Sequence, residues 1–165
     1  MKESKGPQRY TLESPLIIWF FGSKPIGYRC LEYLLQHKNI KIPYVITRAK
    51  DYEGWWNRGR KERIKVRDLA EKRNIPVFTH QEFLEFFKTH KPKNPHLVIS
   101  VEHGYRIPKE ILEYATIGGM NLHLAPLPMY RGCNTFSHAI INGDDEYWVT
   151  MHWMSPEFDA GEIIS

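Results

Sequence analysis

The chain has 165 residues, of which 42% are hydrophobic and 25% are charged, and its formal net charge is +4 at pH 7. These values are typical of one soluble globular domain, large enough to bury most of the surface that its unfolded chain exposes. Since no apolar run approaches the roughly 20 residues that span a bilayer, we expect no contact with a membrane.

The N-terminal segment 1–14 is polar and lacks the apolar stretch of a signal peptide. We therefore expect a flexible leader and a cytoplasmic protein. The two cysteines, Cys30 and Cys133, have a spacing that fits neither a metal site nor a redox pair. We expect free thiols and no bound metal.

The first predicted element is a strand over residues 16–21, because this continuous apolar run suits a strand buried on both faces of a parallel sheet. After the turn GSKPIG, apolar residues recur at helical spacing over 26–37 and predict a helix. The later elements follow in chain order: a strand at 42–48, a helix at 66–73 leading into a short strand, a helix at 80–90, a strand at 96–101, a helix at 108–115, a strand at 118–125, a helix at 135–143 and a half-buried strand at 147–154.

The alternation of strands and helices predicts a three-layer, Rossmann-like α/β domain with a mostly parallel sheet and right-handed crossovers. In such sheets ligands bind beyond the carboxyl ends of the strands, so we expect the site at the loops that follow Phe21, Val101 and His123. The first of these loops, GSKPIG, could cradle a phosphate, but Pro25 removes one backbone donor and the full dinucleotide fingerprint is absent. A plain strand-to-helix turn is the favoured interpretation.

Asn121 and His123 lie two residues apart in the predicted strand 118–125, so their side chains point to the same side of the sheet. An asparagine amide and a protonated histidine can both donate to an oxyanion, and histidine can also transfer a proton. Asp159, in the segment EFDAGEII, could orient the imidazole and hold it charged, as an aspartate does in hydrolytic triads. From the residues alone, a structural turn at Asp159 and a structural role for His123 remain the alternatives.

The segments NLHLAPLPMYRG, AIINGD, VTMHWM and FDAGEII resemble, in order and spacing, the catalytic core of the folate-dependent formyltransferases. This family contains methionyl-tRNA, glycinamide ribonucleotide and amino-sugar formyltransferases. The upstream segments FFGSKPIGYRCLEYLL and LVISVEHGYRIPKEIL resemble the family more weakly, and the similarity covers most of residues 16–164. It implies the formyltransferase version of the α/β fold, with residues 15–165 as the catalytic domain.

The resemblance implies an enzyme that moves a formyl group from 10-formyltetrahydrofolate to a primary amine. Asn121 and His123 would polarise the formyl group, while Asp159 would tune His123 and help to remove a proton through water. The pterin would lie in a slot between two loops. These loops supply the expected cofactor-binding residues Val101, Glu102, His103, Gly104, Tyr105, Ile107, Glu157, Phe158 and Gly161. Family members usually have apolar or small residues where this chain has Glu102 and His103.

The segment KDYEGWWNRGRKERIKVRD combines a basic cluster with two tryptophans. It could bind nucleic acid through phosphate contacts and stacking, and tRNA-formylating members of the family carry a basic loop at about this place. A solvated loop, or contact with a small phosphorylated acceptor, is favoured, because the residues CNTFSH after Gly132 differ from those usual in the initiator-tRNA enzymes. We therefore expect a nucleotide-linked amino sugar as the acceptor. Methionyl-tRNA is the alternative, bound through Arg58, Arg60, Lys61 and Arg63.

Two further alternatives use the same motif. Water in place of the amine would make the protein a formyltetrahydrofolate hydrolase, and the loss of an acceptor site would leave a non-catalytic folate-binding domain. Because family members continue beyond residue 164, the resemblance also implies a domain cut short at its C-terminal end. Apolar Ile163 and Ile164 at that end favour self-association into a homo-oligomer.

Overall fold

The computed structural model describes residues 15–49, 54, 57–59 and 64–165. The expected leader 1–14 lies outside these ranges, as do Trp55, Trp56 and three members of the basic cluster, Arg60, Lys61 and Arg63. None of the helices within the described ranges is long and apolar enough to cross a membrane.

Strands and helices alternate along the described chain, as predicted. They are, in order, β1 (Leu16–Gly22), α1 (Lys24–Leu34), β2 (Ile40–Ile46), α2 (Val66–Lys72), β3 (Val77–Phe78), α3 (His80–His90), β4 (Leu97–Val101), α4 (Lys109–Tyr114), β5 (Gly118–His123), α5 (Thr135–Asn142) and β6 (Thr150–Trp153). The strands form one six-stranded sheet in the order β3-β2-β1-β4-β5-β6, parallel except for the antiparallel pairing of β6 with β5. The three-layer, mostly parallel α/β fold is therefore confirmed.

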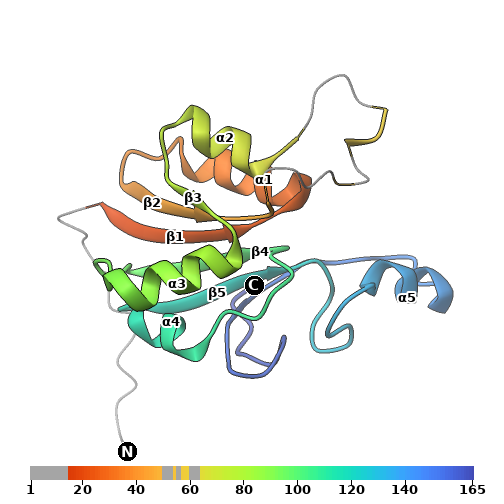
Figure 1. The fold of residues 1–165 in the computed structure, drawn as a ribbon. Coiled ribbons are helices and arrows are strands. Elements are labelled where there is room, and N and C mark those ends of the chain that lie inside the picture. The colour runs from red at the N-terminus through yellow and green to blue at the C-terminus, as the bar shows by residue number, and fades with distance from the viewer. Residues whose placement is uncertain (1–14, 50–53, 55–56, 60–63) are drawn as a thin grey trace, which may run out of the picture.

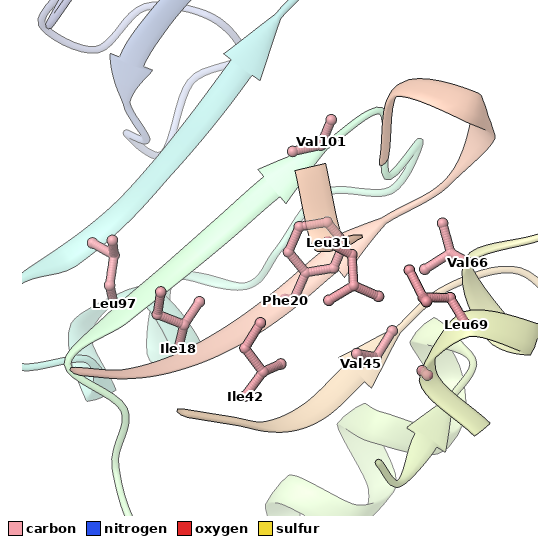
Figure 2. Packing of buried hydrophobic residues seen from close by; sticks show 10 residues of the cluster. Ile18, Phe20, Leu31, Ile42, Val45, Val66, Leu69, Leu97 and Val101 are labelled. Atoms are coloured by element: carbon pink, nitrogen blue, oxygen red, sulfur yellow. The ribbon is translucent and has the colours of Figure 1, made fainter. Parts of the chain in front are cut away.

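The two faces of the sheet bury different sets of side chains. Figure 1 shows α1 and α2 over one face and α3 and α4 over the other, with α5 standing away from the sheet. Alternate residues of β1 point to opposite faces of the sheet. On one face, Ile18 and Phe20 pack with Leu31 of α1, as Figure 2 shows. Trp19, on the opposite face, packs edge-on against Phe83 of α3, with ring centroids 5.2 Å apart. Full burial of each such side chain contributes about 1.5–3 kcal/mol, which explains the unbroken apolar run in β1.

The sheet brings three loops together at the carboxyl ends of β1, β4 and β5. Chain order reverses between β1 and β4, the point where open α/β sheets leave a crevice for ligands. The backbone N–H of Ser23, after β1, donates to the carbonyl of Val101 at the end of β4 at 3.1 Å. The register places Ser100 of β4 beside Asn121 of β5. The loops after β1, β4 and β5 therefore meet at the place where the sequence analysis expects the site.

Two predicted elements have different limits in the structure. Helix α1 begins at Lys24 rather than residue 26, because Pro25 occupies its first turn, where a missing N–H costs no hydrogen bond, and it ends at Leu34 rather than 37. The last predicted strand, 147–154, is shorter as β6. Trp148, inside the predicted strand, precedes β6 and is exposed.

Strand β6 is hydrogen-bonded on both sides. One side pairs with β5, and the other pairs with the chain segment 162–165, which returns antiparallel to it. The N–H of Trp153 donates to the carbonyl of Glu162 at 2.8 Å, and the N–H of Ile164 donates to that of Met151 at 2.7 Å. This returning segment closes the loop that carries Asp159.

Candidate functional site

Asn121 and His123 reach one cluster of polar side chains from β5. Nδ1 of His123 lies 3.7 Å from Oδ2 of Asp159, and Nδ2 of Asn121 lies 3.1 Å from Nε2 of His152. Nε2 of His152 is in turn 3.5 Å from Oδ1 of Asp159. The structure thus brings the three predicted catalytic residues together and places a fourth polar side chain, His152, beside them.

Asp159 is held in place by its backbone and by a donor from another loop. Its φ of 49° lies in the left-handed region, which aspartate tolerates better than most residues. The backbone N–H of Gly132 donates to Oδ2 at 2.9 Å. Burial alone raises the pKa of this carboxyl group, but hydrogen bonding from His152 and Gly132 and the nearby charge of His123 bring the pKa below its ordinary value. The carboxylate is therefore a preformed acceptor.

Gly161 allows the Asp159 loop to return against β6. A Cβ at this position would lie 1.7 Å from the carbonyl oxygen of Trp153, a separation that no side chain can adopt. Only glycine permits so close an approach of two backbones. The expected role of Gly161 in cofactor binding stays a prediction, whereas its structural role follows directly from this contact.

His152 lies within the strand predicted at 147–154, but the sequence analysis did not name it as a site residue. The antiparallel register of β5 and β6 sets it directly opposite Asn121, and its residue surface is only 1% exposed. The contact with Asp159 raises the pKa of His152 above the ordinary histidine value, although burial opposes this shift. The cross-strand register would have identified His152, but it can be used only once β6 is known to pair antiparallel with β5, which the sequence does not tell.

Both histidines use one ring nitrogen to donate to a backbone carbonyl. Nε2 of His123 lies 2.6 Å from the carbonyl oxygen of Tyr130, and Nδ1 of His152 lies 2.8 Å from that of Trp153. Since a carbonyl only accepts, these nitrogens carry hydrogen. The second nitrogen of each ring faces Asp159, so one carboxylate can accept a hydrogen bond from either imidazole.

The turn between β5 and α5 supports this arrangement. The hydroxyl of Thr150, on β6, donates to the carbonyl of Ala125 at 2.8 Å and accepts from the N–H of Leu127 at 3.1 Å. At the far end of the turn, the hydroxyl of Tyr130 donates to Asp144 and accepts from the amide of Asn142. The Pro-rich turn that follows the Asn-x-His motif is therefore tied down at both ends.

The expected cofactor-binding residues differ in exposure. Their two loops lie together, because the guanidinium of Arg106 donates to the carbonyl of Pro156 and sits 5.9 Å from the ring centroid of Phe158. Arg106 was not among the predicted residues. In the first loop the buried residues are Val101, His103 and Ile107, the half-buried one is Glu102, and the exposed ones are Gly104 and Tyr105. In the second loop Glu157 and Phe158 are exposed, and Gly161 is half-buried. Cofactor contact at these residues stays a prediction.

His103 belongs to a buried ring cluster beneath the first loop. Its Nε2 lies 2.9 Å from Nδ1 of His80, at the start of α3, and its ring contacts Phe21 edge-on at 5.1 Å. Burial, with smaller contributions from His80 and Arg48, lowers the pKa of His103 to about 3. A neutral, buried imidazole explains how the chain tolerates a polar residue where apolar ones are usual.

A basic depression lies between the start of α1 and the loop that follows β2. Its cationic lining residues are Lys24, Arg48, Lys65 and Arg67. Lys24 pairs with Glu102 of the loop after β4, and Arg67 pairs with Glu71 at 3.6 Å. Through the pairing of Lys24 with Glu102, the depression adjoins the loop that follows β4. Arg58, from the predicted tRNA-binding set, is exposed.

Comparisons with known proteins agree with this geometry. The family model described as "Formyl transferase" matches residues 17–165. The chain belongs to the formyl transferase family. It is 35% identical over 150 residues to a methionyl-tRNA formyltransferase of Clostridioides difficile (strain 630), and 33% identical over 150 residues to one of Halothermothrix orenii. These alignments cover 89% of this chain but 47% and 46% of the relatives, so the chain spans about half the length of the curated relatives it matches.

Solved structures of a formyltransferase and of a deformylase share the fold. A phosphoribosylglycinamide formyltransferase from Anaplasma phagocytophilum superimposes with a TM-score of 0.67 at 18% identity, over 92% of this chain and 70% of that one. A formyltetrahydrofolate deformylase from Pseudomonas syringae gives a TM-score of 0.66 at 17% identity, over 93% of this chain and 50% of that one. The expected family and fold are confirmed.

Proposed function

We propose that this family member transfers a formyl group from 10-formyltetrahydrofolate to a primary amine, and that the amine belongs to methionyl-tRNA. The observation that carries the proposal is the cluster formed by Asn121, His123 and Asp159 at the carboxyl end of β5. Two potential hydrogen-bond donors and one carboxylate, held within a few ångströms, suit attack of an amine on a formyl carbon.

The proposed reaction forms one carbon–nitrogen bond and breaks another. The acceptor amine attacks the formyl carbon, and Asn121 and His123 donate hydrogen bonds to the oxygen that becomes negative. The amine loses a proton to Asp159, through water, and N10 of the folate gains a proton as its bond to the formyl carbon breaks. For His123 to donate to the formyl oxygen, its Nε2 must leave the carbonyl of Tyr130, which lies 2.6 Å away.

The acceptor proposed here differs from the one favoured by the sequence. The segment CNTFSH after Gly132 weakens a tRNA assignment, but the relatives named above are, by their names, methionyl-tRNA formyltransferases. For the choice of acceptor, 35% identity over 150 residues to a methionyl-tRNA formyltransferase outweighs one unusual segment of the turn. The basic depression lined by Arg48 and Lys65 suits either acceptor, since both carry phosphates.

The test is formyl transfer by this chain from 10-formyltetrahydrofolate, with aminoacylated initiator tRNA, a nucleotide-linked amino sugar or no acceptor present. We expect formyl-methionyl-tRNA and no formylated sugar. Transfer to the sugar would restore the first interpretation of the sequence. Release of formate without any acceptor would instead indicate a hydrolase, and folate binding without turnover would indicate a non-catalytic domain.

A further inference from the structure

His152 faces two neighbours that make opposite demands on the same nitrogen. Its Nε2 lies 3.1 Å from Nδ2 of Asn121, which requires Nε2 to accept, and 3.5 Å from the carboxylate of Asp159, which favours Nε2 as a donor. The other ring nitrogen is already a donor to the carbonyl of Trp153 at 2.8 Å. The proton on Nε2 therefore decides which neighbour is satisfied.

Each protonation state of His152 selects one orientation of the Asn121 amide. A neutral ring accepts from the amide NH₂, which is then held against β6 and is less available to a substrate. A protonated ring donates from Nε2, and the amide must turn by 180° so that its oxygen faces the ring. The NH₂ then takes the position opposite His152, where it is available to another acceptor.

We propose that His152 is a positioning residue, whose protonation turns the amide of Asn121 so that its NH₂ can donate to the formyl oxygen. The inference rests on the proposed formyl transfer for its purpose, but the coupling between the two side chains exists in the free protein. His152 does not touch the reacting atoms. It acts through Asn121, across the antiparallel pair of β5 and β6.

The surroundings of His152 favour its protonated form. Asp159 is the acid that faces it, and its contact raises the pKa of His152. The other titratable group near the ring is His123, whose ring centroid lies 6.4 Å away. The returning segment packs beside β6 through Ile163, which carries no charge. As pH rises through this raised pKa, the proton is lost and Asn121 returns to the orientation that holds its NH₂ against His152.

Nuclear magnetic resonance of the free chain tests the coupling without any turnover. We expect the side-chain NH₂ signals of Asn121 to move with the same midpoint as the ring nitrogens of His152 when pH is varied. In His152→Gln, whose amide can donate from about the position of Nε2 but does not titrate, this movement of the Asn121 signals should disappear. Asn121 signals that stay constant while His152 titrates would overturn the proposal, whatever the protein catalyses.

Kinetics with the proposed substrates give a second readout. In the wild type, kcat should fall as pH rises through the pKa of His152, whereas His152→Gln should retain more activity than His152→Leu and lack this pH dependence. His152→Leu offers no donor, so kcat should fall by on the order of 10²–10³, the effect of losing one oxyanion donor, with little change in KM. A His152→Gln protein with the wild-type pH dependence would contradict the inference. If no acceptor is formylated, the proposed function is wrong. The resonance experiment still tests the coupling between His152 and Asn121.

Discussion

The carbonyl oxygen of Tyr130 lies 2.6 Å from Nε2 of His123. Two residues later in the same turn, the N–H of Gly132 donates to Asp159. One short turn thus supplies an acceptor for the imidazole and a donor for the carboxylate, so its geometry sets the distance between the two groups.

Replacing Gly132 by alanine should lower turnover by moving this turn. Its φ is +91° and a Cβ would meet no atom within 4 Å, so the substitution acts through backbone strain of about 1–2 kcal/mol. The shifted N–H would stabilise the Asp159 carboxylate less. Gly59→Ala is a matched control, because Gly59 has φ +73° and equally open space but lies between β2 and α2 rather than in this turn. Equal turnover in the two variants, measured at equal folded fraction, would refute this role for the turn.

Alanine in place of Asn121, His123 or Asp159 should abolish most turnover and leave the fold intact. Losing one preorganised donor to an oxyanion commonly costs on the order of 10²–10³ in rate. Because the three residues act as a unit, a double variant should be little worse than the worst single one. Saturating single-turnover kinetics would measure this, with circular dichroism as the check on folding. A His123→Ala protein that keeps a near-native rate would rule out the mechanism.

Acid should destabilise the protein through His103. Its pKa is about 3 in the folded chain, against 6.5 as the ordinary value, so between these limits the unfolded state binds more protons. Above pH 6.5 His103 does not lower the free energy of unfolding. As pH falls below this value the free energy of unfolding decreases, by about 2 kcal/mol at pH 5. Urea unfolding at pH 7.5 and 5 should show a smaller acid loss in His103→Phe than in wild type. The exposed His138→Gln serves as control and should behave like wild type.

Binding of tRNA should depend on the basic segment if methionyl-tRNA is the acceptor. Each phosphate contact removed lowers the slope of log affinity against log salt by about 0.9 in duplex regions. The test variant replaces, all by alanine, Arg58, Arg60, Lys61 and Arg63. A control of equal charge change replaces residues near the amino ends of the strands, far from the site: Arg73, Lys88, Lys91 and Lys93. The same affinity and salt slope in both variants would remove the segment from tRNA binding.

The fold could be predicted well because its signals are local. Strand β1 is an unbroken apolar run, and the structure confirms that it is buried on both faces. Helix α3 begins at a capping box, in which Thr79 and Glu82 exchange hydrogen bonds. Element limits were less certain, as for α1 and β6, because proline in a first turn and the end of a cross-strand ladder depend on neighbours that the local pattern does not contain.

The site was predicted only where its residues lie close in sequence. Asn121 and His123 share a strand, so the period of two was sufficient to place them together. Asp159 required the family resemblance, and His152 required the register of β6, which is a tertiary property. The tie between Arg106 and the loop of Phe158 is likewise a contact across 50 residues or more, and no periodicity in the sequence predicts it.

The returning segment 162–165 has a consequence for the motion of the site. With backbone hydrogen bonds to β5 on one side and to this segment on the other, β6 is an interior strand. Its amides cannot exchange with solvent through fraying of a free edge; they require the two ladders to separate. The amides around His152 should therefore be among the slowest to exchange in the protein, while the imidazole itself remains free to gain and lose a proton. The backbone that carries His152 is therefore rigid, and the proposed change of protonation is confined to its side chain.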